Sequence, residues 1–132
     1  MNEVRVIIAG GRDFTDYHKL KTYMNCLLQL LDKSQVEIIS GGAKGADSLG
    51  ERYAREFGYK LKRFPADWNK YGKAAGPIRN KEMALYAAEA KGVLVAFWDG
   101  SSRGTYDMIT RAKEYGLEVY IPKYSRRKSN ES

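Results

Sequence analysis

The sequence is built around three glycine-rich turns, each of which separates an apolar, strand-like run from a helical pattern. The clearest covers residues 40–47 and follows the β-branched run at 36–39. The other two cover residues 10–14 and 100–105. A turn that leads from a strand into the first turn of a helix directs free backbone N–H groups and the positive end of the helix dipole at one point. The chain is therefore expected to fold from strand–helix units whose turns can bind anions.

Five strands and four main helices are expected in alternation. The strands are expected at residues 4–9, 36–40, 59–64, 93–98 and 118–121, and the helices at 16–32, 45–57, 77–90 and 105–115. The first and fourth strands are almost wholly apolar, which is typical of central strands covered on both faces. This pattern predicts an α/β fold, a single Rossmann-like doubly wound parallel sheet with strand order 3-2-1-4-5.

The length and composition fit one domain. The chain has 132 residues, a net charge of +7 and a single cysteine, Cys26, which we expect to be a small core residue. No apolar run approaches the roughly 20 residues of a membrane span, and the N-terminus lacks the form of a signal peptide. These features predict a cytoplasmic protein without a membrane partner. We expect one ligand-binding domain over residues 1–124 and a disordered basic polar tail over 125–132.

The positive charge suits an anionic ligand or nucleic acid, and it equally suits a merely soluble surface. All three glycine turns follow C-terminal strand ends, so they should converge on the crevice beside the first and fourth strands. Neither the P-loop nor the G-x-G-x-x-G fingerprint is present. The prediction of a phosphate site therefore depends on the position of the turns and on Arg12, Lys44 and Arg103. A long connection, residues 65–76, is expected to be a functional or disordered loop.

Four segments together resemble one superfamily. They are Ile8-Ala9-Gly10-Gly11-Arg12-Asp13-Phe14, Ser40-Gly41-Gly42-Ala43-Lys44-Gly45-Ala46-Asp47, Gly76-Pro77-Ile78-Arg79-Asn80-Lys81-Glu82-Met83 and Trp98-Asp99-Gly100-Ser101-Ser102-Arg103-Gly104-Thr105-Tyr106-Asp107-Met108. The sequence is similar in these segments to the SLOG superfamily, named for the SMF/DprA and LOG proteins, and within it to the small YspA/YpsA-related branch. The resemblance covers residues 4–122. It implies a Rossmann-like fold and a pocket for a nucleotide or a nucleotide-derived ligand.

Some relatives, the LOG proteins, hydrolyse the N-glycosidic bond of nucleoside monophosphates. They use an arginine in R-K-x-x-M and a glutamate in P-G-G-x-G-T-x-x-E. Arg79, followed by Met83, fits the first pattern, but Met108 stands where the second has its glutamate. Asp107 is one residue early, and a step of about 100° along a helix sends its carboxylate in another direction. This departure favours binding or sensing over hydrolysis.

The predicted site gathers residues from all four segments. If the protein is an enzyme, Arg79 and Asp107 are the catalytic candidates. Trp68 is a candidate for base stacking or a lid, and Trp98 for base stacking, although core packing is the commoner use of a strand tryptophan. No metal and no cofactor are predicted. The residues predicted to bind ligand or phosphate are Gly10, Gly11, Arg12, Asp13, Ser40, Gly41, Gly42, Lys44, Asp47, Arg79, Asn80, Ser101, Ser102, Arg103, Gly104 and Thr105.

Three functions remain open. The first is a protein that binds a nucleotide-derived small molecule for sensing, signalling or sequestration. The second is a LOG-type hydrolase of the nucleotide N-glycosidic bond. The third is a DprA-type binder of single-stranded nucleic acid, for which the scattered tyrosines and the tail residues Arg126, Arg127 and Lys128 would supply stacking and charge. The resemblance to LOG proteins also allows a homo-oligomer.

Overall fold

The computed structural model describes residues 3–124, so the tail at 125–132 lies outside the described residues. Five parallel strands form one sheet in the order β3-β2-β1-β4-β5, as predicted. The strands are β1 (Val4–Gly10), β2 (Val36–Ser40), β3 (Lys60–Arg63), β4 (Lys91–Phe97) and β5 (Glu118–Tyr120). The main helices are α1 (Tyr17–Leu28), α2 (Ala46–Phe57), α4 (Ala75–Ala88) and α5 (Arg103–Glu114). The predicted Rossmann-like fold is confirmed.

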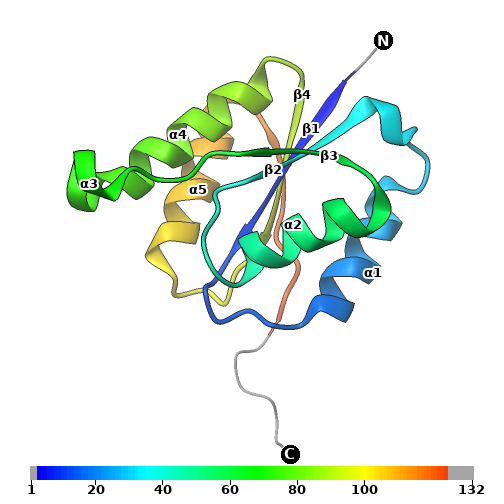
Figure 1. Cartoon of the computed structure of the whole chain (residues 1–132), viewed down its shortest axis with the longest axis horizontal. Helices are drawn as coiled ribbons and strands as arrows, with labels where there is room; N and C mark the ends of the chain where they lie inside the picture. Colours follow the sequence, from blue (N-terminus) through cyan, green and yellow to red (C-terminus); the bar gives the residue numbers. More distant parts are fainter. Residues whose placement is uncertain (1–2, 125–132) are drawn as a thin grey trace, which may run out of the picture.

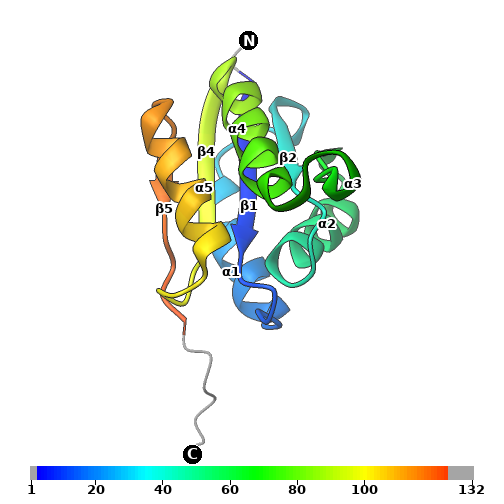
Figure 2. The ribbon, with the colours of Figure 1, turned by 90° about the vertical axis from the view of Figure 1, so that its left-hand side faces the viewer.

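Helices cover both faces of the sheet (Figure 1). Helices α1 and α2 lie on one face, and α4 and α5 lie on the other, where Figure 2 shows them in front of β1 and β4. The alternation of side chains along a strand explains the two cores. In β1, Val6 and Ile8 point into the core under α1 and α2, whereas Ile7 points into the core under α4 and α5. Both sides of the central strands are therefore buried, which accounts for their continuous apolar sequence.

Helix α1 is shorter than the expected 16–32. Asp16 is its N-cap, with a side chain that accepts from the backbone N–H of Lys19, and the helix ends at Leu28. Asp32 then starts a separate 3-10 turn, Lys33–Gln35, by accepting from the backbone N–H of Ser34. The residues between the end of α1 and Asp32 do not continue the buried face of the helix, and Leu30 is 92% exposed. Leu31, which the expected helix 16–32 also contained, is likewise exposed.

Cys26 also differs from the prediction, because it is exposed. It lies on α1 between Met24 and Leu28, which are both buried, so the helical step turns it toward solvent. The prediction of a core cysteine was wrong because one position on an amphipathic helix can face either way. His18, to which we assigned no role, is exposed on the same helix.

The long connection is an ordered segment. It contains a short helix, α3 (Trp68–Tyr71), capped by Asp67, and a 3-10 turn (Gly72–Ala74) that continues directly into α4. Helix α4 therefore starts at Ala75, two residues before the predicted Pro77. Pro77 still lies in the first turn, where its missing N–H costs no helical hydrogen bond. Along residues 3–124, no helix has the length and apolar character needed to cross a bilayer.

Candidate functional site

A cleft of about 690 Å³ lies at the C-terminal ends of the central strands. Its walls come from the β1–α1 loop, the β2–α2 loop, the β4–α5 loop and the first turns of α4 and α5. The volume is in the range typical of small-molecule sites. The residues that line it are Ala9, Gly10, Gly11, Arg12, Asp13, Ala43, Asp47, Trp68, Gly76, Pro77, Arg79, Asn80, Met83, Asp99, Ser101, Ser102, Arg103, Gly104, Thr105, Asp107 and Met108.

The first two loops pack backbone against backbone. Ala46 donates its N–H to the carbonyl oxygen of Gly11 at 3.2 Å, and Gly11 donates to the carbonyl of Phe97 at 3.2 Å. Gly45 has a φ of 77°, and a Cβ atom there would lie 2.2 Å from the Gly11 oxygen. A Cβ on Gly10 would lie 2.4 Å from the Phe97 oxygen. Only glycines allow this close approach, so these two residues shape the cleft by their lack of a side chain.

Asp47 is a buried acid in the first turn of α2, with 6% of its surface exposed. Its Oδ2 accepts from the backbone N–H of Ala43 at 3.2 Å, which closes the β2–α2 loop onto the helix. Burial raises the pKa of this carboxyl to about 6, against the opposing effect of the Ala43 N–H and the positive charge of Arg79. Asp47, which was predicted to bind the ligand, lines the cleft and at the same time pairs with its own loop.

Arg79 extends from the first turn of α4 across the cleft. Its Nη1 donates to the carbonyl oxygen of Gly41, and its Nε donates to Oδ1 of Asn80 at 3.0 Å. Burial lowers the pKa of the guanidinium, the charge of Asp47 opposes that effect, and the nearby charge of Arg12 adds to it. Arg79 makes no salt bridge with any of residues 3–124. A partly desolvated cation with another cation beside it is the arrangement that a bound anion stabilises.

Asn80 joins α4 to α5. It is 5% exposed, and its Nδ2 donates to the carbonyl oxygen of Gly104 at 3.3 Å and to Oδ2 of Asp107 at 3.0 Å. Arg111 donates to the same Oδ2 from one turn further along α5, also at 3.0 Å. Asp107 and Met108 both line the cleft, so the step of about 100° between them does not remove the carboxylate from it.

The third loop is held by a set of local hydrogen bonds. Oδ1 of Asp99 accepts from the backbone N–H groups of Ser101 and Ser102 at 2.8 and 3.1 Å. Ser102 is the N-cap of α5 and its Oγ lies 3.1 Å from Oγ1 of Thr105. These contacts fix the N-terminus of α5 at the cleft, where the first N–H groups of a helix have no partner within the helix. Arg103 and Gly104 form the start of this helix and are both exposed.

Two tryptophans were expected near the ligand, and only Trp68 lines the cleft. It is 51% exposed and projects from α3 toward the first turn of α4, where its ring lies 3.4 Å from the position of a Cβ on Gly76. Trp98 instead packs with the core under α4 and α5, and its indole Nε1 donates to the carbonyl oxygen of Ser102 at 3.0 Å. Trp98 therefore supports the third loop from behind.

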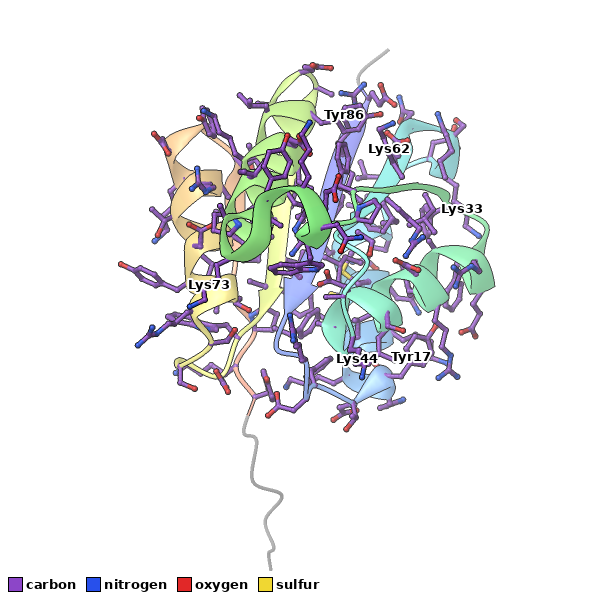
Figure 3. All side chains as sticks on the ribbon, turned by 60° about the vertical axis from the view of Figure 1, so that its left-hand side comes forward. Tyr17, Lys33, Lys44, Lys62, Lys73 and Tyr86 are labelled. Atoms are coloured by element: carbon purple, nitrogen blue, oxygen red, sulfur yellow. The ribbon has the colours of Figure 1, made fainter. Side chains whose placement is uncertain are left out.

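Four other predicted residues lie outside the lining. Ser40 is fully buried, and its hydroxyl donates to Oε2 of Glu51 at 2.7 Å and accepts from the N–H of Gly42 at 3.0 Å. Gly41 lies behind Arg79 and Asp47, where a Cβ would be 2.6 Å from Nη1 and 2.8 Å from Oδ2. Lys44 is exposed at the N-terminal end of α2 (Figure 3). Ser40 and Gly41 thus support the second loop, and of the residues between Ser40 and Gly45 only Ala43 lines the cleft.

Some residues that line the cleft were not predicted to belong to the site. Asp99 begins an Asp-Gly-Ser-Ser turn, a composition that signals side-chain bonding to the following backbone N–H groups. Gly76 and Pro77 stood in a recognised segment without an assigned role, and Met83 and Met108 form an apolar part of the wall. Among residues 3–124 there is no cluster of three or more histidine, cysteine or acidic side chains placed to hold a metal ion.

Comparisons with known proteins agree with this architecture. The sequence model of the YspA, cpYpsA-related SLOG family (YAcAr) matches residues 4–71. The chain is 34% identical over 122 residues to the Gene 61 protein of Mycobacterium phage D29, an alignment that covers 87% of this chain and 93% of that protein.

Two solved structures have a similar fold. DNA processing protein A (DprA) from Streptococcus pneumoniae superposes with a TM-score of 0.68 at 18% identity, over 91% of this chain and 50% of that one. The chain thus spans half the length of that DprA chain. The structure of TM1055, a structural genomics target, superposes with a TM-score of 0.54 at 21% identity, over 90% of this chain and 72% of that one. Because both sequence identities are low, this structural similarity establishes a shared fold and nothing about function.

Proposed function

Because the chain belongs to the YspA, cpYpsA-related SLOG family, we propose that its cleft binds a nucleotide or a nucleotide-derived small molecule. The role that follows is sensing, signalling or sequestration of that molecule. The family match and the shared fold support a nucleotide-related or DNA-related role in general terms. The choice of a small molecule comes from the volume of the cleft, about 690 Å³, and from its charge.

Arg79 is the observation that carries the proposal. Its guanidinium is partly desolvated and lies near the cation Arg12, and among residues 3–124 it forms no ion pair, although the charge of Asp47 acts on it. Its hydrogen bonds to Gly41 and Asn80 hold the planar group in place before any ligand arrives. A fixed guanidinium suits bidentate contact with a phosphate, which would supply the missing negative charge.

A phosphate would be bound between Arg79 and the N-terminus of α5. Gly104 has no side chain to block an approach to the backbone there, and nothing lies within 4 Å of the point where a Cβ would be. Arg12 and Arg103 add positive charge at the edges of the cleft. Trp68, which is half-exposed over the first turn of α4, offers a flat ring against which a base can stack.

The proposal is tested by finding the ligand. Purified protein is heat-denatured, any released small molecule is identified by mass spectrometry, and a panel of nucleotides is titrated calorimetrically into ligand-free protein. We expect at least one nucleotide to bind. Arg79→Ala should weaken its binding about 10-fold or more, as loss of a charged contact does. Gly104→Val should also weaken it, because the new side chain would block the approach of a phosphate to the backbone there.

Lys81→Ala is the matched control, because Lys81 is an exposed cation on the same helix as Arg79. Its affinity should equal that of the unsubstituted protein. Arg79 also supports the Gly41 carbonyl, so denaturation curves of every variant are needed alongside. Gly104→Val places its side chain in open space and should leave the fold intact. Nucleotide affinities that are unchanged in both Arg79→Ala and Gly104→Val would refute the proposal.

One contact set favours a second function, hydrolysis of a nucleotide N-glycosidic bond. Asn80 bonds both Arg79 and Asp107, so a cation and a carboxylate are held on one cleft wall by the same amide. In this alternative Asp107 takes the place of the glutamate found in LOG proteins. Chromatography of each nucleotide after incubation tests it: release of free base and ribose phosphate that is abolished in Asp107→Asn supports hydrolysis, and intact nucleotide excludes it.

Nucleic-acid binding is the remaining alternative. One structural neighbour, DprA, is a DNA processing protein. The tail residues Arg126, Arg127 and Lys128, on which our prediction relied, lie outside the described residues. Affinity for a single-stranded oligonucleotide that falls steeply with salt would favour this function. A homo-oligomer is a further prediction, which sedimentation tests.

A further inference from the structure

We infer that Asp107 makes the cleft selective for ribonucleotides over deoxyribonucleotides, by accepting a hydrogen bond from a ribose hydroxyl through its Oδ1 atom. The inference rests on the proposed function, since it concerns the same cleft. The inference specifies the sugar of the ligand and names the residue that recognises this sugar.

The two oxygens of Asp107 have different surroundings. Oδ2 accepts from Nδ2 of Asn80 and from Nε of Arg111, each at 3.0 Å. These two donors come from different helices, so they fix both the position and the rotation of the carboxylate. Oδ1 has no hydrogen-bond partner among residues 3–124, although the side chain is only partly exposed. The residue lines the cleft, and its remaining acceptor is therefore available to a ligand there.

The chemistry of an ionised carboxylate limits what this acceptor can bind. It has no proton to donate, so it repels phosphate and needs an O–H or N–H donor on the ligand. A nucleotide carries such donors in two places, the sugar hydroxyls and the N–H groups of its base. Both would make the same kind of charge-assisted hydrogen bond.

Position along α5 favours the sugar. The first residues of the helix, Arg103 and Gly104, form the positively charged end proposed to hold phosphate, and Asp107 follows about one turn later, a distance of about 5 Å along the axis. In a nucleotide the sugar comes directly after the phosphate and the base lies beyond it. A phosphate at the helix N-terminus thus brings the ribose hydroxyls to Asp107, and the base extends farther, toward the side of the cleft formed by α3.

The experiment compares matched pairs of nucleotides. The four ribonucleoside 5′-monophosphates and their 2′-deoxy and 3′-deoxy forms are titrated into the unsubstituted protein and into Asp107→Ala. For the base that binds, we expect the ribonucleotide to bind about 10-fold more tightly than at least one deoxy form, the value expected for one hydrogen bond to a charged group. In Asp107→Ala this ratio should fall to near one, while the affinity for the deoxy form stays the same or improves.

Two further variants keep the test decisive. Glu114→Ala removes the same charge from an exposed position on α5 and should preserve the ratio. Arg111→Gln releases Oδ2 without altering the cleft lining, so it should lower the ratio even if Asp107→Ala does not fold. The ratio is the informative readout, because a general loss of structure would weaken both nucleotides alike.

The outcomes separate this inference from the proposed function. Equal binding of ribo- and deoxy forms by the unsubstituted protein, or a ratio that survives in both Asp107→Ala and Arg111→Gln, overturns the inference and leaves nucleotide binding in place. If the protein instead binds ribo- and deoxy forms equally but distinguishes bases with an amino group from bases without one, Oδ1 contacts the base. That result also overturns the inference. If no nucleotide binds at all, the proposed function fails and the inference fails with it.

Discussion

Asn80→Ala should lower both the stability of the protein and its affinity for a ligand, because one buried amide connects the two helices that form a wall of the cleft. Asn80 accepts from Nε of Arg79 at 3.0 Å and donates to Gly104 and Asp107 at 3.3 and 3.0 Å. Each hydrogen bond contributes about 1 kcal/mol net. The three partners are all partly solvent-accessible, so water can replace some of what is lost. We therefore expect a loss of about 2–3 kcal/mol in the free energy of unfolding.

Urea denaturation followed by circular dichroism measures this loss as a lower midpoint at an unchanged slope. Asn69→Ala is the control, because Asn69 is an exposed residue of the same type on α3. It should cost less than about 0.5 kcal/mol, as surface substitutions do. Affinity for the bound nucleotide should also fall in Asn80→Ala, since Arg79 and Asp107 both lose a positioning contact. A stability loss in Asn80→Ala no larger than that of Asn69→Ala would refute the reasoning.

Three further predictions concern other parts of the cleft. The pKa of Asp47 is raised to about 6 from 3.8, so the folded state binds a proton more tightly than the unfolded state, and stability falls as pH rises between these values. Relative to Asp47→Asn, the unsubstituted protein should gain about 2 kcal/mol as pH falls from 7 to 4 in denaturant titrations; a difference independent of pH would contradict this. Gly45 and Gly58 have nearly the same φ, 77° and 76°, but Gly58 is in the left-handed region with a ψ of 27°, whereas Gly45 has a ψ of −126°, and only the Cβ at Gly45 would meet other atoms. Gly58→Ala should therefore cost about 1–2 kcal/mol and Gly45→Ala at least about 2 kcal/mol more, from backbone strain and the close contact together; equal unfolding midpoints would contradict this. Binding of a nucleotide should quench tryptophan fluorescence through Trp68, so Trp68→Phe should abolish the change; quenching that persists would assign it to Trp98.

Much of the fold follows directly from local patterns. The apolar runs of β1 and β4 indicate central strands, and the strand–helix alternation leads to the observed strand order. Gly58 ends α2 in a left-handed conformation, directly after the predicted end of that helix at residue 57. The errors lie where local patterns are ambiguous: an amphipathic pattern does not say that α1 stops at Leu28, nor that Cys26 faces solvent.

The sequence by itself determined which loops would meet, because the C-terminal ends of parallel strands share one edge of a sheet, and it placed Arg12, Arg79 and Arg103 on those loops. Only the tertiary structure decided which of the predicted side chains face the cleft. Ser40 and Trp98 form hydrogen bonds that support their own loops. Trp68 lines the cleft from a short helix that no periodic pattern in the sequence predicted. The hydrogen bond from Asn80 to Oδ2 of Asp107, which leaves Oδ1 for a ligand, joins residues 27 positions apart. Such a contact depends on the angle between two packed helices, a quantity that no local pattern of residues encodes.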